Sequence, residues 1–370
     1  YNNNGKVTIL FSGRENTGLT DFTYLSNKLG PSCRIPYCTI MNFTLRFLAL
    51  LLGLSLYGAA VANHPGRLRI ASYNVESLCD TLHDPRLEDA EFTPQGSKRW
   101  NTDRYKTKIA HIARVIDDLD ADLLVLEEIE NEEVLRDLMF ATQSDYNYVH
   151  RDSRDRRGMD VALLYRSSRF FPLHTRRISG RGLSREALFV KGVLANGDTL
   201  SVIGVHLPSK QNAQSYRLNA LLSLRSVIDS IFSRNPSEKL IVLGDFNTEP
   251  ITRQTMRTLR LSDALPIERD PAEDRSLYTP FLRLSRKGYG SLIYRDRRQL
   301  FDFIAFSRSL LTDNSLSYNG SCGIFVRDYL LDPESPFKGY PLRSFRNGRY
   351  TAGYSDHLPV YLDLKIQHAE

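Results

Sequence analysis

The residues Leu240–Pro250, with the sequence LIVLGDFNTEP, carry the clearest chemical signal in the chain. The four apolar residues at the start predict a buried strand, and Gly244 permits a turn at its end. Asp245 and Asn247 follow two residues apart, so an extended chain would point both side chains the same way. The segment therefore predicts a carboxylate and an amide at the rim of a sheet.

Polar side chains of similar chemistry stand at the ends of most other apolar runs. They are Asn74, Glu128, His206, Asp302 and the run Ser355-Asp356-His357, which precedes the last strand. Each has an ordinary structural explanation when taken alone, such as a satisfied core histidine at 206 or a favourable helix entry at 128. Burying all of them without a common partner is costly. A divalent cation is a natural partner because carboxylate and amide oxygens suit Mg²⁺, whereas Cys–His spacing typical of zinc sites is absent.

Alternating apolar runs and amphipathic segments predict the elements that position these residues. Asn196-Gly197-Asp198 marks a hairpin turn, and the polar stretch 76–101 is long enough to indicate a functional loop or an insertion. We expect strands at 68–75, 123–126, 161–165, 189–194, 200–207, 240–243, 300–306 and 358–364, and helices at 103–119, from about 132 to 142, at 213–232 and near 251–259. The pattern indicates an α/β fold, a single domain of mixed strands with helices on their outer faces.

The first 62 residues read as segments outside this domain. Met41 is followed by a short basic region, an apolar run at 47–57 and the small residues Ala60-Val61-Ala62, which together indicate a secretory signal peptide at 41–62. The apolar run is short for a transmembrane helix. We expect cleavage near Ala62-Asn63 and a secreted or periplasmic domain at 63–370. Residues 1–40 are interpreted as a non-native upstream extension, with a disordered natural extension as the alternative.

Charge and cysteine content constrain the partners only weakly. The whole chain carries a formal charge of +6, and residues 63–370 keep 44 basic and 41 acidic residues, so the domain is only mildly basic. This balance does not by itself indicate nucleic acid. Cys79 and Cys322 remain in a compartment that permits disulfides, and the sequence leaves open whether they pair. We expect a monomer with no transmembrane span in the mature chain.

Six motifs recur in an order and spacing that resemble a known group of enzymes. They are Tyr73-Asn74-Val75-Glu76, Leu126-Glu127-Glu128, Val205-His206-Leu207-Pro208-Ser209, Gly244-Asp245-Phe246-Asn247, Phe301-Asp302 and Ser355-Asp356-His357-Leu358-Pro359-Val360. From about Leu68 to Leu364 the chain resembles the endonuclease/exonuclease/phosphatase superfamily, which includes deoxyribonuclease I, exonuclease III and inositol polyphosphate 5-phosphatases. The resemblance implies a four-layer α/β sandwich, with two mixed β-sheets packed face to face and helices outside.

The resemblance also implies metal-assisted phosphoester hydrolysis by in-line attack of water. Mg²⁺, with Mn²⁺ as the alternative, would be held mainly by Glu128, with Asn74 and Asp356 beside it. Asp245 would orient or deprotonate the water, and Asn247 would donate to a phosphoryl oxygen. His357 would contact the phosphate with Asp302 fixing its orientation, and His206 would be a second phosphate contact.

Two further residues resemble family positions less closely. Arg185, in Ser184-Arg185-Glu186, is a candidate phosphate clamp, with a solvated hairpin arginine as the alternative. Asp160 opens the third strand where the family often places a polar active-site residue, so it is a candidate substrate contact. The chain departs from the family at Phe303, because relatives usually carry a polar residue after the motif aspartate.

The substrate class is less constrained than the reaction. A nuclease acting on DNA or RNA is favoured, with backbone contacts from the arginine-rich segment 151–157 and from Arg283, Arg286, Lys287, Arg295, Arg297 and Arg298. The alternative is a phosphatase or phosphodiesterase for a small or lipid-linked phosphate, of the inositol phosphate or sphingomyelin type, with aromatic side chains near 278–281 meeting the headgroup. A non-catalytic binding protein is disfavoured because the motif residues are intact.

Overall fold

The computed structural model describes residues 66–264 and 274–367. The predicted upstream extension and signal peptide at 1–62 lie outside these residues. Among the described residues, no helix has both the length and the apolar character needed to cross a lipid bilayer.

Two large sheets form the centre of the domain. The six-stranded sheet has the order β14-β17-β1-β2-β4-β3 and the seven-stranded sheet has the order β5-β6-β7-β8-β13-β10-β9. β1 pairs with β2, β7 with β8 and β9 with β10 in parallel, while the other pairs in these sheets are antiparallel, so both sheets are mixed. The strands of the first sheet are β1 (Arg67–Leu78), β2 (Leu123–Ile129), β3 (Tyr146–His150), β4 (Asp160–Arg166), β14 (Leu316–Ile324) and β17 (Val360–Ile366). Those of the second are β5 (Phe170–Ile178), β6 (Ala187–Leu194), β7 (Thr199–His206), β8 (Leu240–Asp245), β9 (Leu261–Ser262), β10 (Leu277–Tyr278) and β13 (Asp302–Ser307).

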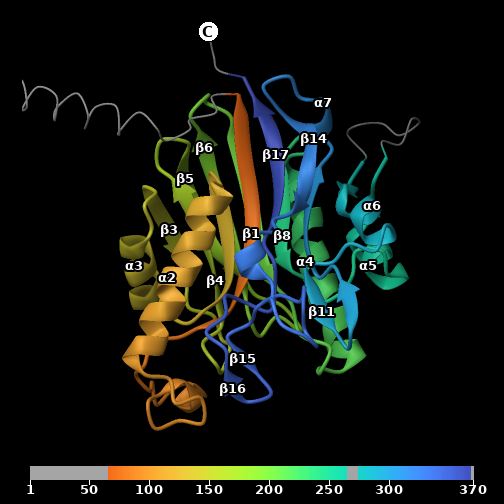
Figure 1. Cartoon of the computed structure of the whole chain (residues 1–370). Coiled ribbons are helices and arrows are strands. Elements are labelled where there is room, and N and C mark those ends of the chain that lie inside the picture. Colours follow the sequence, from red (N-terminus) through yellow and green to blue (C-terminus); the bar gives the residue numbers. More distant parts are fainter. Residues whose placement is uncertain (1–65, 265–273, 368–370) are drawn as a thin grey trace, which may run out of the picture. The chain divides into compact units, whose positions relative to one another are not determined.

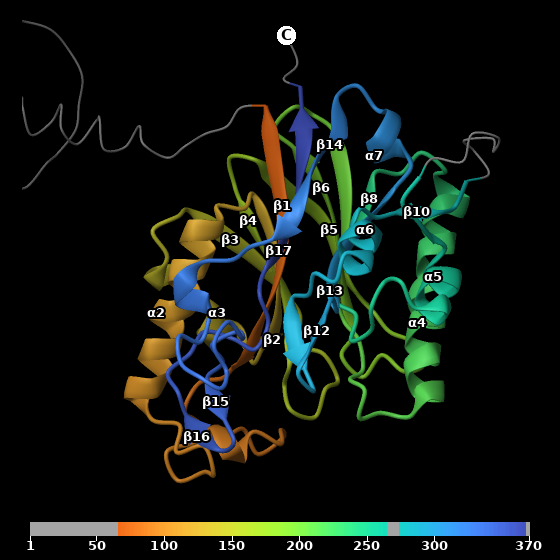
Figure 2. The same ribbon diagram turned by 45° about the vertical axis from the view of Figure 1, so that its right-hand side comes forward.

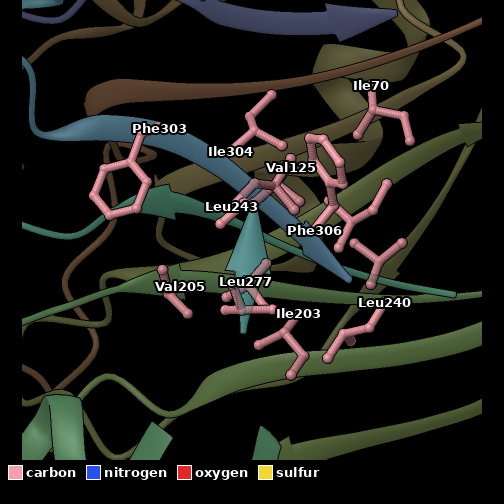
Figure 3. Close-up of a cluster of buried hydrophobic side chains, with 14 of the residues drawn as sticks. Ile70, Val125, Ile203, Val205, Leu240, Leu243, Leu277, Phe303, Ile304 and Phe306 are labelled. Atoms are coloured by element: carbon pink, nitrogen blue, oxygen red, sulfur yellow. The ribbon is translucent and has the colours of Figure 1, made fainter. Parts of the chain in front are cut away.

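The main core lies between the two sheets. β1 and β2 lie against β7, β8 and β13. Figure 3 shows Ile70 and Val125 of the first sheet close to Leu243 and Ile304 of the second, and all four side chains are almost fully buried. Burial of this apolar surface from both sheets is the main driving force that holds them face to face.

Helices cover the outer face of each sheet (Figures 1 and 2). α2 (Thr102–Leu119) and α3 (Glu132–Ala141) pack on the six-stranded sheet, where Ile112 and Ile116 share a buried cluster with Ala71 and Tyr73 of β1. α4 (Gln214–Arg234) and α5 (Arg253–Leu259) cover the seven-stranded sheet. This arrangement confirms the predicted four-layer α/β sandwich.

Short elements complete the described part of the domain. They are the 3-10 helices η1 (Ala90–Phe92) and η2 (Asp328–Leu330), the helices α6 (Phe281–Arg286) and α7 (Ser309–Thr312), and two hairpins. One hairpin joins β11 (Leu292–Tyr294) to β12 (Arg297–Gln299), and the other joins β15 (Phe345–Arg346) to β16 (Arg349–Tyr350). α7 and the β15–β16 hairpin lie at opposite ends of the sheets (Figures 1 and 2). The sequence analysis predicted no strand at either hairpin.

Five strands of the two large sheets, β3, β5, β9, β10 and β14, were not predicted. β5 has the sequence FFPLHTRRI and is largely exposed at a sheet edge, so it lacks a buried alternating face. β14 contains Asn319 and Gly320 within an irregular register, which weakens its strand signal. Cys79 and Cys322 are both free thiols and do not form a disulfide. Tyr278 and Phe281 are buried, so they are not the exposed headgroup contacts that the alternative function required.

Candidate active site

The predicted site residues converge where five strands end. Asn74 and Glu128 lie near the ends of β1 and β2, and in the second sheet Asp245 pairs across the strands with both His206 and Asp302. A cleft of about 870 Å³ opens at this point. Its lining includes Glu128, Arg185, His206, Asp245, Asn247, Asp356 and His357.

Asp245 and Asn247 meet through a tight turn. The backbone N–H of Asn247 donates to Oδ1 of Asp245 at 2.7 Å, and its side-chain Nδ2 donates to Oδ2 at 3.1 Å. Asn247 has a φ of +51°, so the chain turns after Asp245 and is not extended as the sequence argument assumed. The same Nδ2 also donates to the Leu207 carbonyl at 2.9 Å. The turn therefore fixes the Asp245 carboxylate from two directions.

Gly244 is required for β8 to approach β7. It has a φ of +139°, and a Cβ atom added there would lie 2.0 Å from the carbonyl oxygen of Val205. Such a contact is far inside van der Waals distance, and the φ value is one that side-chain-bearing residues rarely adopt. The glycine therefore sets the position from which Asp245 enters the cleft.

Asp245 is a buried carboxylate with a strongly altered acidity. Nδ2 of Asn74 donates to its Oδ2 at 3.2 Å, and only 2% of the residue is exposed. Burial raises the pKa of Asp245 to about 7, with the Asp302 charge adding to the rise and His357 opposing it. A carboxylate with this pKa is suited to accept and release a proton near neutral pH.

His357 and Asp302 form a buried pair. Nδ1 of His357 lies 2.7 Å from Oδ2 of Asp302, which also accepts a hydrogen bond from Ser291 at 2.5 Å. Burial alone would lower the pKa of His357, but the Asp302 charge and hydrogen bond outweigh it and raise the pKa well above its ordinary value. His357 is therefore a cation at neutral pH, and its Nε2 lies 4.0 Å from Oδ2 of Asp245.

Phe303, the departure from the family pattern, has a structural role. Its ring stacks on Phe246 with centroids 3.7 Å apart and an angle of 12° between the planes. Both rings are buried. Phe303 therefore packs behind the Asp245–Asn247 turn and excludes water from that side of the site.

His206 and Arg185 form the opposite side of the site. A guanidinium N–H of Arg185 donates to Nε2 of His206, which lies 3.5 Å from Oδ2 of Asp245. Burial, together with the charges of Arg185 and His357, holds the pKa of His206 well below its ordinary value. His206 is therefore neutral, and Arg185 supplies the positive charge. Arg185 is itself buried and paired at 3.3 Å with Asp155, so it is a fixed part of the cleft and not a solvated hairpin residue.

Glu128 is held as a carboxylate anion. The backbone N–H and hydroxyl of Ser77 donate to its Oε2 at 2.8 and 2.9 Å, and Oε1 lies 3.4 Å from Nδ2 of Asn74. Burial would raise the pKa of Glu128, but the charges of Arg185 and Arg157 and the Ser77 hydrogen bond outweigh it and lower the pKa. Asn74 uses its Oδ1 to accept from the N–H of Glu76, so its amide nitrogen faces both carboxylates.

Asp356 lines the same cleft on the side of the loop that precedes β15. Its Oδ2 accepts from Nη2 of Arg343 at 3.0 Å, and Nε of Arg343 donates to Glu76 at 3.0 Å. Arg343 therefore bridges two carboxylates at the edge of the site. Glu76 belongs to the first sequence motif and could therefore have been predicted as a site residue. Arg343 lies in an irregular segment with no motif or periodic pattern, so there was no reason in the sequence to predict it.

Three predicted site residues do not line the cleft: Asn74 and Asp302 lie behind it and contact residues that do, whereas Asp160 is bonded elsewhere. Oδ1 of Asp160 accepts from the backbone N–H of Ser153 at 2.9 Å, and its Oδ2 lies 3.2 Å from Nε2 of His150. These bonds fix the loop that leads into β4. The acidic residue of this region that does line the cleft is Asp155, which lies within the arginine-rich segment 151–157 and was not itself a predicted site residue.

Solved structures with the same fold share little sequence with the chain. D. rerio TDP2 complexed with a single-strand DNA product is 16% identical, with 81% of this chain and 99% of that chain covered and a TM-score of 0.52. An endonuclease/exonuclease/phosphatase from Bacteroides vulgatus is 16% identical, with coverage of 81% and 99% and a TM-score of 0.51. The human Nocturnin catalytic domain with a bound sulfate anion is 16% identical, with coverage of 81% and 95% and a TM-score of 0.50. These likenesses concern the fold alone.

Sequence comparison gives a more specific result at the level of the family. No curated protein sequence matches the chain. The family model described as Endonuclease/Exonuclease/phosphatase family matches residues 69–366, which span both sheets and every strand end that reaches the cleft. The chain therefore belongs to the endonuclease/exonuclease/phosphatase family, whose enzymes hydrolyse phosphoesters.

Proposed function

We propose that this protein is a divalent-metal-dependent nuclease that hydrolyses phosphodiester bonds by in-line attack of water. The observation that carries the proposal is the position of Asp245. Its Oδ2 lies 3.5 Å from Nε2 of His206 and 4.0 Å from Nε2 of His357, at the mouth of a cleft lined by further charged groups. A proton acceptor and a histidine cation thus face the same small volume, as phosphoryl transfer to water requires.

The residues around Glu128 fit a divalent cation. Glu127, Glu128, Asp245 and Asp302 are four carboxylates within one buried region, and burial together with the charges of Asp302 and Asp245 raises the pKa of Glu127 well above its ordinary value. This excess of negative charge is the environment in which a cation is stabilised. Glu128 and Asp356 would hold Mg²⁺ or Mn²⁺ through their carboxylates. Asn74 would join them only after its amide turns, because Oδ1 now accepts from the N–H of Glu76 and Nδ2 faces Glu128 and Asp245. When bound, the metal would supply positive charge that polarises the phosphoryl group.

In the proposed reaction the water oxygen bonds to phosphorus as the opposite P–O ester bond breaks, and the leaving alkoxide takes up a proton from solvent. Protein side chains carry the other proton and charge movements. Asp245 accepts a proton from the attacking water at Oδ2, which its pKa of about 7 permits at neutral pH. The Asp302 carboxylate contacts Nδ1 of His357 and stabilises the protonated imidazole. The Nε2–H of His357 is therefore available to a phosphoryl oxygen. Arg185 offers a second positive charge beside neutral His206. Asn247 orients Asp245 through its Nδ2, which also donates to the Leu207 carbonyl. To donate to a phosphoryl oxygen as predicted, Nδ2 must break one of these two hydrogen bonds.

Basic side chains around the cleft support a nucleic acid over a small phosphate. Arg157 and Arg343 line the cleft, and Arg295, Arg297 and Arg298 are exposed on the β11–β12 hairpin, whose Leu292 and Tyr294 line it as well. Cations along such a surface bind successive backbone phosphates. In contrast, Arg283 and Arg286 lie on α6 and contact Asp263, so these two predicted contacts are engaged elsewhere.

A substrate panel on the purified domain tests the reaction. Plasmid DNA, RNA, inositol phosphates, sphingomyelin and bis(p-nitrophenyl) phosphate would be assayed with Mg²⁺, with Mn²⁺ and with chelator. We expect metal-dependent hydrolysis of nucleic acid, lost by at least about 10³-fold in Asp245→Asn and His357→Ala. Asp263→Asn, on the surface beside α6, is the matched control. Turnover of small phosphates alone would favour the phosphatase alternative, and wild-type turnover in either site variant would refute the site.

We also propose that the domain is exported after removal of residues 41–62, because these residues have the pattern of a secretory signal peptide. N-terminal sequencing of exported protein tests this. A product that begins at Asn63 is expected, and one that begins at Tyr1 would contradict it.

A further inference from the structure

Two walls of similar composition border the cleft. The Trp100 wall consists of Phe92, Lys98, Trp100 and Phe345, and the Tyr294 wall consists of Lys210, Tyr294 and Phe301. Every one of these side chains lines the cleft, and none belongs to the catalytic group described above. Each wall combines aromatic rings with a lysine ammonium, which is the composition of surfaces that bind single-stranded nucleic acid.

The Trp100 wall is rigid. Nε1 of Trp100 donates to the carbonyl of Cys79 at 3.0 Å, and only 1% of the residue is exposed. The rings of Phe92 and Phe345 both pack on it with centroids 6.0 Å away, the first edge-on and the second tilted. The loop 76–101, noted in the sequence for its length, thus delivers an aromatic cluster to the cleft. A ring held in this way loses little conformational entropy when a ligand stacks beside it.

Lys98 presents its charge on this wall. Its Nζ lies 4.6 Å from the centroid of the Phe345 ring, and the nearest carboxylate oxygen, on Glu91, is 3.9 Å away. The side chain retains 30% exposure and Glu91 retains 47%, so this ion pair is weak. The ammonium therefore remains available to a phosphate that enters the cleft.

The Tyr294 wall repeats the arrangement with a different set of elements. Nζ of Lys210 lies 4.3 Å from the centroid of Phe301 and 5.4 Å from that of Tyr294. It donates to the neutral Gln299 side chain at 2.6 Å, and none of the described residues gives it a carboxylate at ion-pair distance. Tyr294 is 37% exposed. This wall therefore also offers an unneutralised cation and an accessible aromatic face.

The two walls join the catalytic centre through different elements. Arg343, two residues before Phe345, bonds Asp356 and so connects the Trp100 wall to that residue. Leu292, on the same strand as Tyr294, forms a backbone bridge with His357 and connects the other wall there. Figure 2 shows the β15–β16 hairpin and β12 as separate projections at the same end of the domain. A strand that contacts both walls would therefore lie close to Asp356 and His357.

We propose that the two walls bind consecutive nucleotides of a single strand on either side of the scissile phosphate, so that the enzyme cuts within a strand and not from its end. The proposal rests on the nuclease function proposed above and specifies its substrate. Bases stack on the two accessible rings, half-buried Phe345 and exposed Tyr294, while Lys98 and Lys210 contact the flanking phosphates. A paired duplex keeps its bases stacked on one another, so it cannot use the walls in this way.

Circular substrates test the mode of cleavage because they have no ends. The purified domain would be incubated with circular single-stranded DNA, a circular single-stranded RNA, the linear form of each and a relaxed duplex plasmid. Fragmentation of either single-stranded circle supports the proposal, and the better circle identifies the sugar. Degradation of linear strands with intact circles would leave the nuclease function standing and overturn the inference. Equal cutting of duplex and single-stranded circles would overturn it as well, and hydrolysis of phosphomonoesters alone would refute both.

Wall variants test the contacts themselves. For Lys98→Ala, Phe345→Ala and Lys210→Ala, kcat/KM would be measured on a single-stranded oligonucleotide and on bis(p-nitrophenyl) phosphate. We expect the ratio of the two values to fall by roughly five- to 100-fold for Phe345→Ala, as loss of one base stack predicts. For each lysine variant we expect the affinity for the oligonucleotide to fall less steeply with salt concentration than it does for the wild type. Arg327→Ala removes a comparable cation from the Phe325 ring outside the cleft and should leave the ratio unchanged. An unchanged ratio in all three wall variants would overturn the proposal.

Discussion

Nδ1 of His357 lies 2.7 Å from Oδ2 of Asp302, and both residues are buried, with His357 lining the cleft and Asp302 behind it. The carboxylate keeps the imidazole protonated and orients its Nε2 toward Asp245. Removing that negative charge while keeping the shape should therefore impair the reaction without unfolding the domain. We expect Asp302→Asn to lower kcat on bis(p-nitrophenyl) phosphate by about 10²-fold or more, with a small change in KM.

A control for this prediction is available in the same contact. Ser291 donates to the same Oδ2 atom at 2.5 Å but carries no charge. Ser291→Ala should therefore cost much less than Asp302→Asn. Equal losses in the two variants would indicate that packing around Asp302, and not its charge, supports His357.

Gly244 offers a prediction about stability. Gly244→Ala forces a Cβ atom to within 2.0 Å of the Val205 carbonyl at a φ of +139°. We expect the free energy of unfolding to fall by about 3 kcal/mol or more, measured by urea denaturation. Gly320→Ala is the matched control because Gly320 also has a positive φ, of +90°, but has nothing within 4 Å of the added atom. Its cost should be only about 1 kcal/mol. Similar costs at both positions would show that backbone strain, without the clash, explains the requirement for glycine.

The predicted site residues that the structure brings together share one property. Asn74, Glu128, His206 and Asp245 each stand at the end of an apolar run, and the ends of neighbouring strands must meet at one edge of a sheet. Local pattern therefore determined their position. Asp155 and Arg343 lie in irregular segments whose path depends on tertiary contacts, so no local period marked them.

Lys108 shows a different failure of local reasoning. It sits among the apolar residues of α2, where a lysine normally marks the solvent face, yet only 1% of it is exposed. Its partners come from a segment more than two hundred residues away, through hydrogen bonds to Ser344 and to the Tyr354 carbonyl. Pairing over such a sequence separation cannot be read from a helical pattern.

The buried ammonium of Lys108 should contribute to stability by offsetting Glu76. Burial and the Asp356 charge raise the pKa of Glu76, while Lys108 and Arg343 act in the opposite direction. We expect Lys108→Met to lower the free energy of unfolding by about 2–4 kcal/mol, since it strands polar partners and removes a compensating charge. Exposed Lys106→Met on the same helix is the control. In a double-mutant cycle, the loss of unfolding free energy in Lys108→Met with Glu76→Gln should be smaller than the sum of the losses in the two single variants. Strict additivity would contradict the coupling between the two residues.

Asp313 gives a pH dependence of stability far from the cleft. Its hydrogen bonds to Ser315 and Leu316 and the nearby Lys239 ammonium outweigh burial and lower its pKa to about 2. A carboxyl whose pKa is depressed on folding adds stability above its unfolded value, near 4, and loses it as the pH falls toward 2. Asp313→Asn should therefore be less stable than wild type by about 1 kcal/mol at pH 6, a figure that allows for solvent screening. The difference should shrink below pH 4, as measured by urea denaturation at each pH. Exposed Asp145→Asn should show no such trend, and a gap that stays constant down to pH 3 would refute the assignment.

Glu128 provides the test of metal binding that does not depend on turnover. Its carboxylate is held by two hydrogen bonds from Ser77 and keeps its charge, so it is the best-prepared anionic ligand in the cleft. Glutamine at this position preserves the shape and an acceptor oxygen but removes the charge that a hard cation requires. We expect Mg²⁺ to raise the thermal unfolding midpoint of the wild-type domain, and Glu128→Gln to weaken Mg²⁺ affinity in calorimetric titration by at least about tenfold. Glu133→Gln, on the exposed face of α3, should bind Mg²⁺ like the wild type. If Glu128→Gln retained full Mg²⁺ affinity, the cation would have to bind elsewhere, and the buried group of Asp245, Asp302 and His357, whose ligand atoms lie within 4.8 Å of one another, would be the next site to examine.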